Sequence, residues 1–232
     1  MGVAQFKERV LDVLFPAFCA YRNHIDYSIE SLIARWDEFH DQDVDDCLAA
    51  IDNFVVIDRG GGVYVNERSG SIDLLFHSGM KSISPRPLAL LPEPIITFAV
   101  MYRLYAELGW PRECLGLQSP HPFAFDAMVY ASSTDLMGFI ACEIKASKAA
   151  IDRMMTKMIA YGSDPTILKP HIDPNAFNKV AELRKRQPRY FWAVGPNRYN
   201  LVYEMKYGPD GEMLFNRVAL ACLRYPGSSS AA

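Results

Sequence analysis

Two carboxylates and an amine lie on two strand-like segments in the middle of the chain. Asp126 belongs to the apolar segment 123–130, and Glu143 and Lys145 belong to the apolar segment 137–145. Because side chains alternate along a strand, Glu143 and Lys145 point to the same face. Charged groups on half-buried strands are costly unless a partner compensates them, and a divalent cation held by two carboxylates is such a partner.

The chemistry that fits this arrangement is hydrolysis of a phosphodiester. Mg²⁺ is a hard cation that prefers oxygen ligands and keeps several waters, and Mn²⁺ is its expected substitute. Such a metal polarises a phosphoryl oxygen and lowers the pKa of a bound water. A lysine beside it orients that water and offsets charge in the transition state. We therefore predict that Asp126 and Glu143 bind the metal and that Lys145 assists the nucleophilic water.

The elements that must position these residues follow from hydrophobic periodicity and turn signals between residue 93 and the C-terminus. The pattern predicts, in order, a helix over 95–108, strands over 113–118, 123–130 and 137–145, a helix over 147–161, a helix over 174–186 capped by Asp173, and strands over 190–194, 198–207 and 212–220. This order indicates an α/β domain with a sheet flanked by helices.

This order of elements resembles the PD-(D/E)XK nuclease superfamily, whose restriction-endonuclease-like core is αβββαβ with a mixed sheet. The motif reads Phe125-Asp126, sixteen residues, then Glu143-Ile144-Lys145, and the resemblance covers roughly residues 93–195. It implies a metal-dependent nuclease acting on nucleic acid, with DNA as the expected substrate. It also implies that the Ile144 carbonyl joins the metal ligands, together with a glutamate on the first helix, either Glu93 or Glu107.

One departure from the family's pattern and one rival tripeptide bear on this motif. Some nuclease subfamilies carry Gln-x-x-x-Tyr on the second helix, whereas this chain has Lys157-x-x-x-Tyr161. A second tripeptide of the same type, Glu204-Met205-Lys206, has neither an Asp-bearing strand before it nor a helix after it. Only the tripeptide at 143–145 has both, so we place the site there.

Basic side chains near the motif are candidates for contacts with a nucleic-acid backbone. They are Lys148, Arg153, Lys157, Arg184 and Lys185. A solvated helix face is an equally good explanation of these charges. Cutting both strands of a duplex requires two active sites, which makes a homodimer consistent with this function.

The N-terminal part is acidic and has a different pattern. Residues 1–60 hold 12 Asp/Glu and 5 Lys/Arg, whereas the rest of the chain holds 15 and 19. The pattern predicts helices over 5–21 (kinked or ended early by Pro16), 28–36 and 43–51, then a hairpin of 54–57 and 63–65 around Gly60–Gly62, which resembles a winged helix. The third helix and the residue after it carry Asp43, Asp45, Asp46 and Asp52 and no Lys or Arg, so we expect a protein-contact or packing role rather than entry into a DNA groove.

These patterns divide the chain into an acidic winged-helix-like domain (1–67), a Ser-, Gly- and Pro-rich connector (68–92) and the nuclease-like domain (93–227). The composition, 50% hydrophobic and 22% charged, excludes a disordered chain. No apolar run is long enough to span a bilayer, and no secretory signal is recognised, so we expect no membrane partner and a cytoplasmic location. Five cysteines without a Cys-x-x-Cys pair indicate neither disulfides nor zinc. The alternative function is a non-catalytic, DNA-binding or interaction scaffold with the same fold.

Overall fold

The computed structural model describes residues 2–23, 25–60, 62–69, 73–118, 125–172 and 174–227, without the side chain of Asp73. The expected helix cap at Asp173 and the start of the expected strand 123–130 lie outside the described residues.

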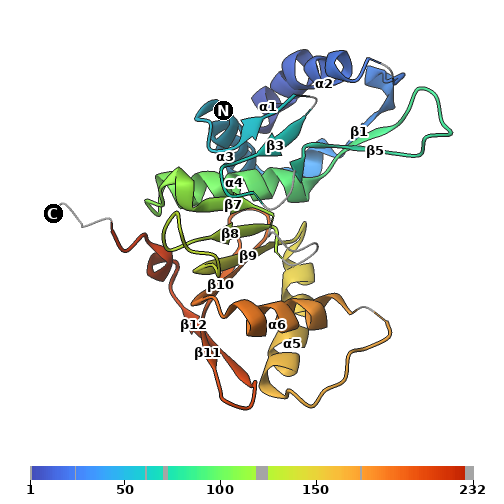
Figure 1. The fold of residues 1–232 in the computed structure, drawn as a ribbon. Helices are drawn as coiled ribbons and strands as arrows, with labels where there is room; N and C mark the ends of the chain where they lie inside the picture. The colour runs from blue at the N-terminus through green and yellow to red at the C-terminus, as the bar shows by residue number, and fades with distance from the viewer. Residues whose placement is uncertain are drawn as a thin grey trace.

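A six-stranded mixed sheet forms the C-terminal part of the molecule (Figure 1). Its spatial order is β12-β11-β10-β9-β8-β7. The strands are β7 (Leu115–Leu117), β8 (Ala127–Val129), β9 (Ile140–Ile144), β10 (Tyr190–Val194), β11 (Asn200–Tyr207) and β12 (Met213–Val218). β9 and β10 are parallel, and the other neighbouring strands are antiparallel. The α/β class expected from the sequence is confirmed.

Helices cover both faces of this sheet (Figure 1). The helix α4 (Pro92–Ala106) lies on one face, and α5 (Lys148–Ser163) and α6 (Asn175–Arg186) lie on the other. Side chains alternate between the two faces of β9, which explains why helices pack on both sides of the sheet. Cys142 is buried in a cluster with α4 residues, and Ala141 is buried in a cluster with α5 and α6 residues. Glu143 therefore belongs to the face that α5 and α6 cover.

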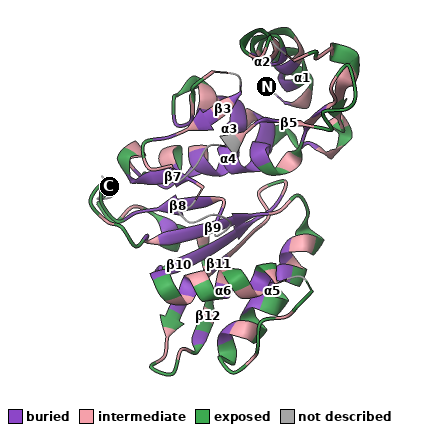
Figure 2. Ribbon diagram, turned by 45° about the vertical axis from the view of Figure 1, so that its right-hand side comes forward, coloured by how far each residue is buried: buried purple, intermediate pink, exposed green. Residues whose placement is uncertain are grey.

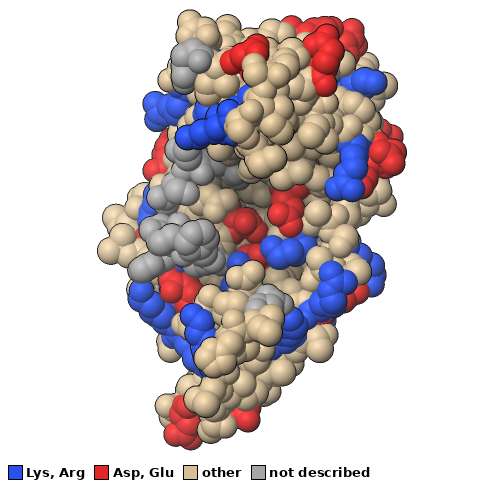
Figure 3. All heavy atoms as spheres, turned by 90° about the vertical axis from the view of Figure 1, so that its right-hand side faces the viewer, with Lys and Arg blue, Asp and Glu red and all other residues tan. Residues whose placement is uncertain are grey.

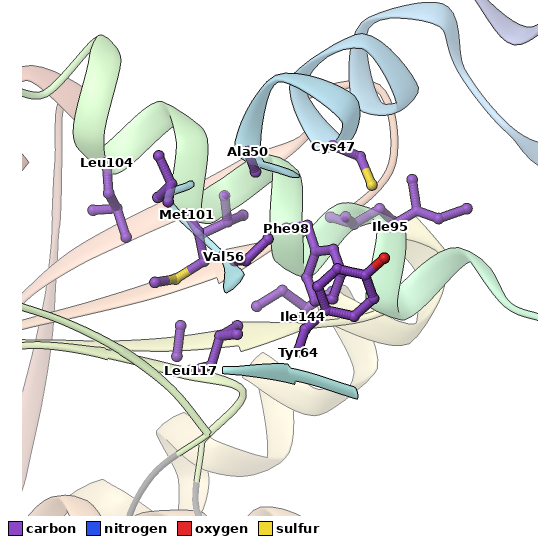
Figure 4. Packing of buried hydrophobic residues seen from close by; sticks show 14 of the residues in the cluster. Cys47, Ala50, Val56, Tyr64, Ile95, Phe98, Met101, Leu104, Leu117 and Ile144 are labelled. Atoms are coloured by element: carbon purple, nitrogen blue, oxygen red, sulfur yellow. The ribbon is translucent and has the colours of Figure 1, made fainter. Parts of the chain in front are cut away.

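The helix α4 is buried almost all round, which explains its unbroken apolar sequence. One side packs on Cys47 and Ala50 of α3 (Asp41–Asp52), and the other lies over Leu117 and Ile144 of the sheet (Figure 4). A helix with two packed faces needs apolar residues at most of its positions. Among the described residues, no helix is long and apolar enough to cross a membrane.

The first helical region runs from Val3 to Tyr21 without a break. It consists of α1 (Val3–Arg9), the π-helical segment η1 (Val10–Leu14) and α2 (Phe15–Tyr21). The π-helical segment lies directly before Phe15-Pro16, where the proline lacks the N–H of a regular helical hydrogen bond. Pro16 thus changes the winding of the helix and does not end it.

The prediction of a helix over 28–36 is wrong. This stretch forms a 3₁₀ turn, η2 (Ile29–Ser31), the strand β1 (Leu32–Ala34) and a second 3₁₀ turn, η3 (Trp36–Glu38). β1 pairs in parallel with β6 (Leu88–Leu90), which is more than 50 residues away in sequence. Pairing with a distant strand overrides the local helical spacing, so the second of the three helices expected for a winged helix is replaced by a strand.

The segment 68–92, expected as a connector, contains regular strands. It contains β4 (Asp73–Leu74), β5 (Phe76–Ser78) and β6, and the sheet order β1-β6-β5 places β6 at the centre of a small sheet. The other small sheet is β2-β3-β4, in which the expected hairpin is present as β2 (Ile57–Asp58) paired with β3 (Val63–Val65). Its turn uses Gly60 and Gly62, with φ of 103° and 65°.

A single cluster of buried side chains joins the N-terminal part to the large sheet. It runs from Phe6 through Tyr64 and Phe98 to Val194, and the buried positions in Figure 2 follow the same path through α4. The ranges 1–67 and 93–227 therefore share one hydrophobic core.

Candidate functional site

The carboxylate of Asp126 lies at the end of β9, beside the Glu-x-Lys tripeptide. Asp126 directly precedes β8, whose first residue, Ala127, pairs with Cys142. The Asp126 N–H donates to the Cys142 carbonyl (3.1 Å), and Asp126 Oδ2 accepts from the N–H of Ile144 (2.7 Å). The antiparallel pairing of β8 and β9 thus brings the first predicted carboxylate next to the second.

The surroundings of Asp126 disfavour the ionised form of its carboxyl group. Burial, and then the negative charge of Glu143, raise the pKa of Asp126 to about 7. The ammonium groups of Lys145 and Lys179 and the hydrogen bond from Ile144 counteract this rise only in part. A cation placed between the carboxylates would favour the ionised form of both.

Glu143 lies between two lysine side chains. Its side chain is only 1% exposed, and Lys145 Nζ donates to Oε1 while Lys179 Nζ donates to Oε2, each at 2.5 Å. Lys145 Nζ also donates to the carbonyl of Ile144 (2.7 Å). The predicted residues 126, 143, 144 and 145 are therefore brought together, and Lys179 is an additional member of the cluster.

The sequence analysis missed Lys179, although a signal for it exists. In α6 the buried residues Ala176, Val180 and Leu183 follow helical spacing, and Lys179 is three residues after Ala176 on that face. A lysine on the buried stripe of a helix is costly unless a carboxylate pairs with it. This placement pointed to a buried acidic partner, which the structure identifies as Glu143.

Lys145 reaches the surface of the site, with its side chain 27% exposed. Burial lowers its pKa, but the carboxylates of Glu143 and Asp126 outweigh this effect, and the net pKa is raised. Lys145 is therefore a cation at neutral pH that can orient a water or contact a phosphate, rather than a general base.

The two candidate glutamates of α4 have different surroundings. Glu93 is in the first turn, and its Oε1 accepts from the N–H of Ala146 (3.2 Å), the residue after Lys145. Glu107, just after the helix, forms an ion pair with Arg198 at 2.6 Å. Of the two, Glu93 is the one beside the cluster. Figure 3 shows acidic side chains in a hollow on the side of the molecule where α5 lies, with Lys and Arg nearby.

The donor atoms suit a hard divalent cation in kind, because they are carboxylate and carbonyl oxygens. Within the described ranges, no group of three or more His, Cys, Asp and Glu side chains is arranged to hold a metal ion. Both oxygens of Glu143 are hydrogen-bonded to ammonium groups. Coordination by Glu143 would therefore need at least one ammonium group to move or to share its oxygen with the cation.

The basic residues near the site fall into two groups. Arg153, Lys157 and Lys185 are exposed, and Lys148 is an exposed side chain paired with Asp152 (2.8 Å). Arg184 instead donates to the backbone carbonyls of Gly211 and Tyr161, at 2.7 Å each. Arg184 thereby links the end of α5 to the β11–β12 turn, so we assign it a structural role.

Two of the acidic residues of α3 face the protein interior. Asp43 and Asp46 are buried and pair with Arg103 of α4, at 2.5 and 2.7 Å, and Asp46 also pairs with Arg198. Asp41 and Asp45 accept from backbone N–H groups of the first residues of the chain. Of the two roles expected for this helix, these contacts are of the packing kind.

Comparison with family models, with curated proteins and with solved structures found no match to this chain.

Proposed function

We propose that this chain is a divalent-metal-dependent nuclease of the PD-(D/E)XK type that hydrolyses phosphodiester bonds, with DNA as its substrate. The observation that carries the proposal is the convergence of Asp126, Glu143 and Lys145 at the adjoining ends of β8 and β9, with Glu93 beside them. The order α4, β7, β8, β9, α5, α6, β10, with β9 and β10 parallel, supports the proposal, because it matches the αβββαβ order of that superfamily with one additional helix before the last strand.

In this function Asp126, Glu143 and the Ile144 carbonyl hold Mg²⁺, with Glu93 as an additional ligand. The metal supplies Lewis acidity and an activated water when it is bound. Lys145 orients the attacking water and places a positive charge where negative charge develops on the phosphate. The exposed residues Arg153, Lys157 and Lys185 track the backbone of the substrate.

The test is cleavage of supercoiled plasmid and of single-stranded DNA with Mg²⁺ or Mn²⁺. Lys145→Ala should lower the rate by about 100-fold or more, the usual effect of removing one electrostatic stabiliser. The chain supplies a matched control in its second Glu-x-Lys tripeptide, because Lys206 is exposed on β11. Lys206→Ala should keep the wild-type rate. Equal activity of wild type and Lys145→Ala would overturn the proposal.

One observation favours the non-catalytic alternative. Glu143 is nearly fully buried and both its oxygens are paired with lysines, as in a structural ion cluster. A scaffold of this kind would be indifferent to divalent cations, whereas a nuclease binds them at Asp126. The thermal response to Mn²⁺ given in the Discussion separates the two.

A further inference from the structure

Lys179 comes from outside the elements that carry the proposed motif. The helix α6 lies between α5 and β10 in the chain order, and it packs against the same face of the sheet as α5. From there its Lys179 side chain, only 12% exposed, reaches Glu143 Oε2 at 2.5 Å. Its ammonium group also lies 5.7 Å from the centre of the Phe125 ring. Two contacts from two directions hold this cation at the buried carboxylate.

The formal charges of the cluster limit how many divalent cations it can bind. Ionised Asp126, Glu143 and Glu93 contribute three negative charges, and Lys145 and Lys179 contribute two positive ones. One divalent cation therefore brings the site to +1, which a single phosphodiester charge neutralises. Two divalent cations would bring it to +3, and each would lie near a fixed ammonium group, where like charges repel.

Resting on the proposed function, we propose that Lys179 takes the place of a second metal ion, so that the site binds one divalent cation per chain. Lys179 Nζ occupies the Oε2 side of Glu143 that a second ion would need. The single metal binds on the Oε1 side, toward the Ile144 carbonyl and Asp126, where the more exposed Lys145 moves aside or shares the oxygen with the cation. The ammonium of Lys179 supplies a fixed positive charge at the carboxylate without a second binding event.

The test is the stoichiometry of Mn²⁺ bound to the full chain, measured by electron paramagnetic resonance of free Mn²⁺ and by calorimetry. Asp126→Asn serves to subtract ions bound elsewhere on the surface. Wild type should bind one Mn²⁺ at the site. Lys179→Gln, which keeps a hydrogen-bond donor but removes the charge, should bind a second ion. Lys179→Arg should bind one, as should Lys206→Gln, which changes an exposed lysine of β11.

Each outcome decides the inference. Two Mn²⁺ in wild type, or one in folded Lys179→Gln, overturns the role of Lys179 and leaves the proposed nuclease function standing. No Asp126-dependent Mn²⁺ in wild type overturns the function and the inference together. If circular dichroism shows that Lys179→Gln does not fold, the stoichiometries of wild type and Lys179→Arg decide: one ion in each supports the inference, and two in either overturns it.

Discussion

The side chain of Asp126 accepts a hydrogen bond from the backbone N–H of Ile144, 2.7 Å away, so its carboxylate is tied to the strand position next to Glu143. Segments separated by sixteen residues thereby place two negative charges in one site. Burial and then this proximity raise the pKa of Asp126, and the raised pKa leads to the first prediction.

The stability of the metal-free chain should fall as the pH rises from about 4 to about 7. The folded chain holds the Asp126 proton up to a pKa of about 7, whereas the unfolded chain releases it near the ordinary value of 3.8. The folded state therefore binds more protons in this window, and its advantage is lost as the pH rises. Urea denaturation in EDTA at pH 5 and pH 8 measures this loss. Asp126→Asn should reduce it, and Asp210→Asn, at an exposed turn, should leave it unchanged.

Mn²⁺ should raise the melting temperature of wild type. A ligand that binds only the folded state stabilises it by about 2.7 kcal/mol at 100 times its Kd. Asp126→Ala removes a proposed ligand and should abolish the response in a thermal scan with millimolar Mn²⁺. A wild-type melting temperature that does not respond to Mn²⁺ would favour the scaffold function.

Arg153 and Arg184 should differ in their effects although both were candidates for nucleic-acid contact. Arg153→Ala should weaken binding of a labelled duplex and lower the slope of log K against log salt by about 1. Arg184→Ala should lower the urea midpoint, because it removes hydrogen bonds to Gly211 and Tyr161. Fluorescence anisotropy, done in an Asp126→Asn background to prevent cleavage, measures the affinity. A larger affinity loss for Arg184→Ala would contradict this assignment.

Arg103→Met should destabilise the chain by about 3 kcal/mol. The substitution leaves Asp43 and Asp46 buried without their main cation, and breaking a buried ion pair costs about 3–5 kcal/mol. The N–H of Asn197 and the side chain of Arg198 still contact these carboxylates, so we expect the lower end of that range. The matched control is Arg9→Met, which breaks an exposed pair with Asp52 and should cost less than about 1 kcal/mol.

Gly162→Ala should destabilise the chain although alanine is the better helix former. A Cβ at Gly162 would lie 2.7 Å from Cε2 of Phe215, whose ring is held edge-on against Phe191 and Tyr203. Overpacking costs about 1–3 kcal/mol, more than the roughly 1 kcal/mol gained in helix propensity. Urea denaturation should show a net loss of about 1 kcal/mol. Ser163→Ala, at the exposed next position, should show none.

The sequence predicted most elements of the large sheet because their signals are local. The run 190–194 is a continuous apolar segment bounded by polar and Gly-Pro turns, and β10 has those bounds. The helix predicted over 95–108 is α4, shifted to Pro92–Ala106, with the prolines in its first turn. Local periodicity and turn residues suffice where an element is long and strongly apolar.

The errors concern pairings between distant residues. Leu32–Ala34 becomes a strand only because Leu88–Leu90 lies beside it, and no local pattern contains that partner. The sequence left open whether the acidic residues of α3 pack inside the protein or meet a partner, because Arg103 and Arg198, which pair with Asp46, are 57 and 152 residues away from it. In the candidate site, the residues of the motif were predicted together, whereas Lys179 lies 36 residues beyond Glu143 and belongs to no motif.

The double packing of α4 has a consequence for how this protein can change over time. Tyr64 from the N-terminal part lies against Phe98 of α4, with ring centres 4.8 Å apart, while the opposite flank of the helix rests on the large sheet. If recombination moved the coding sequence for α4 and β7–β12 into another gene, one side of α4 would lose its packing partners. Arg103 would also lose its acidic partners. The proposed catalytic half is therefore not modular, and we expect both halves to be inherited as a unit.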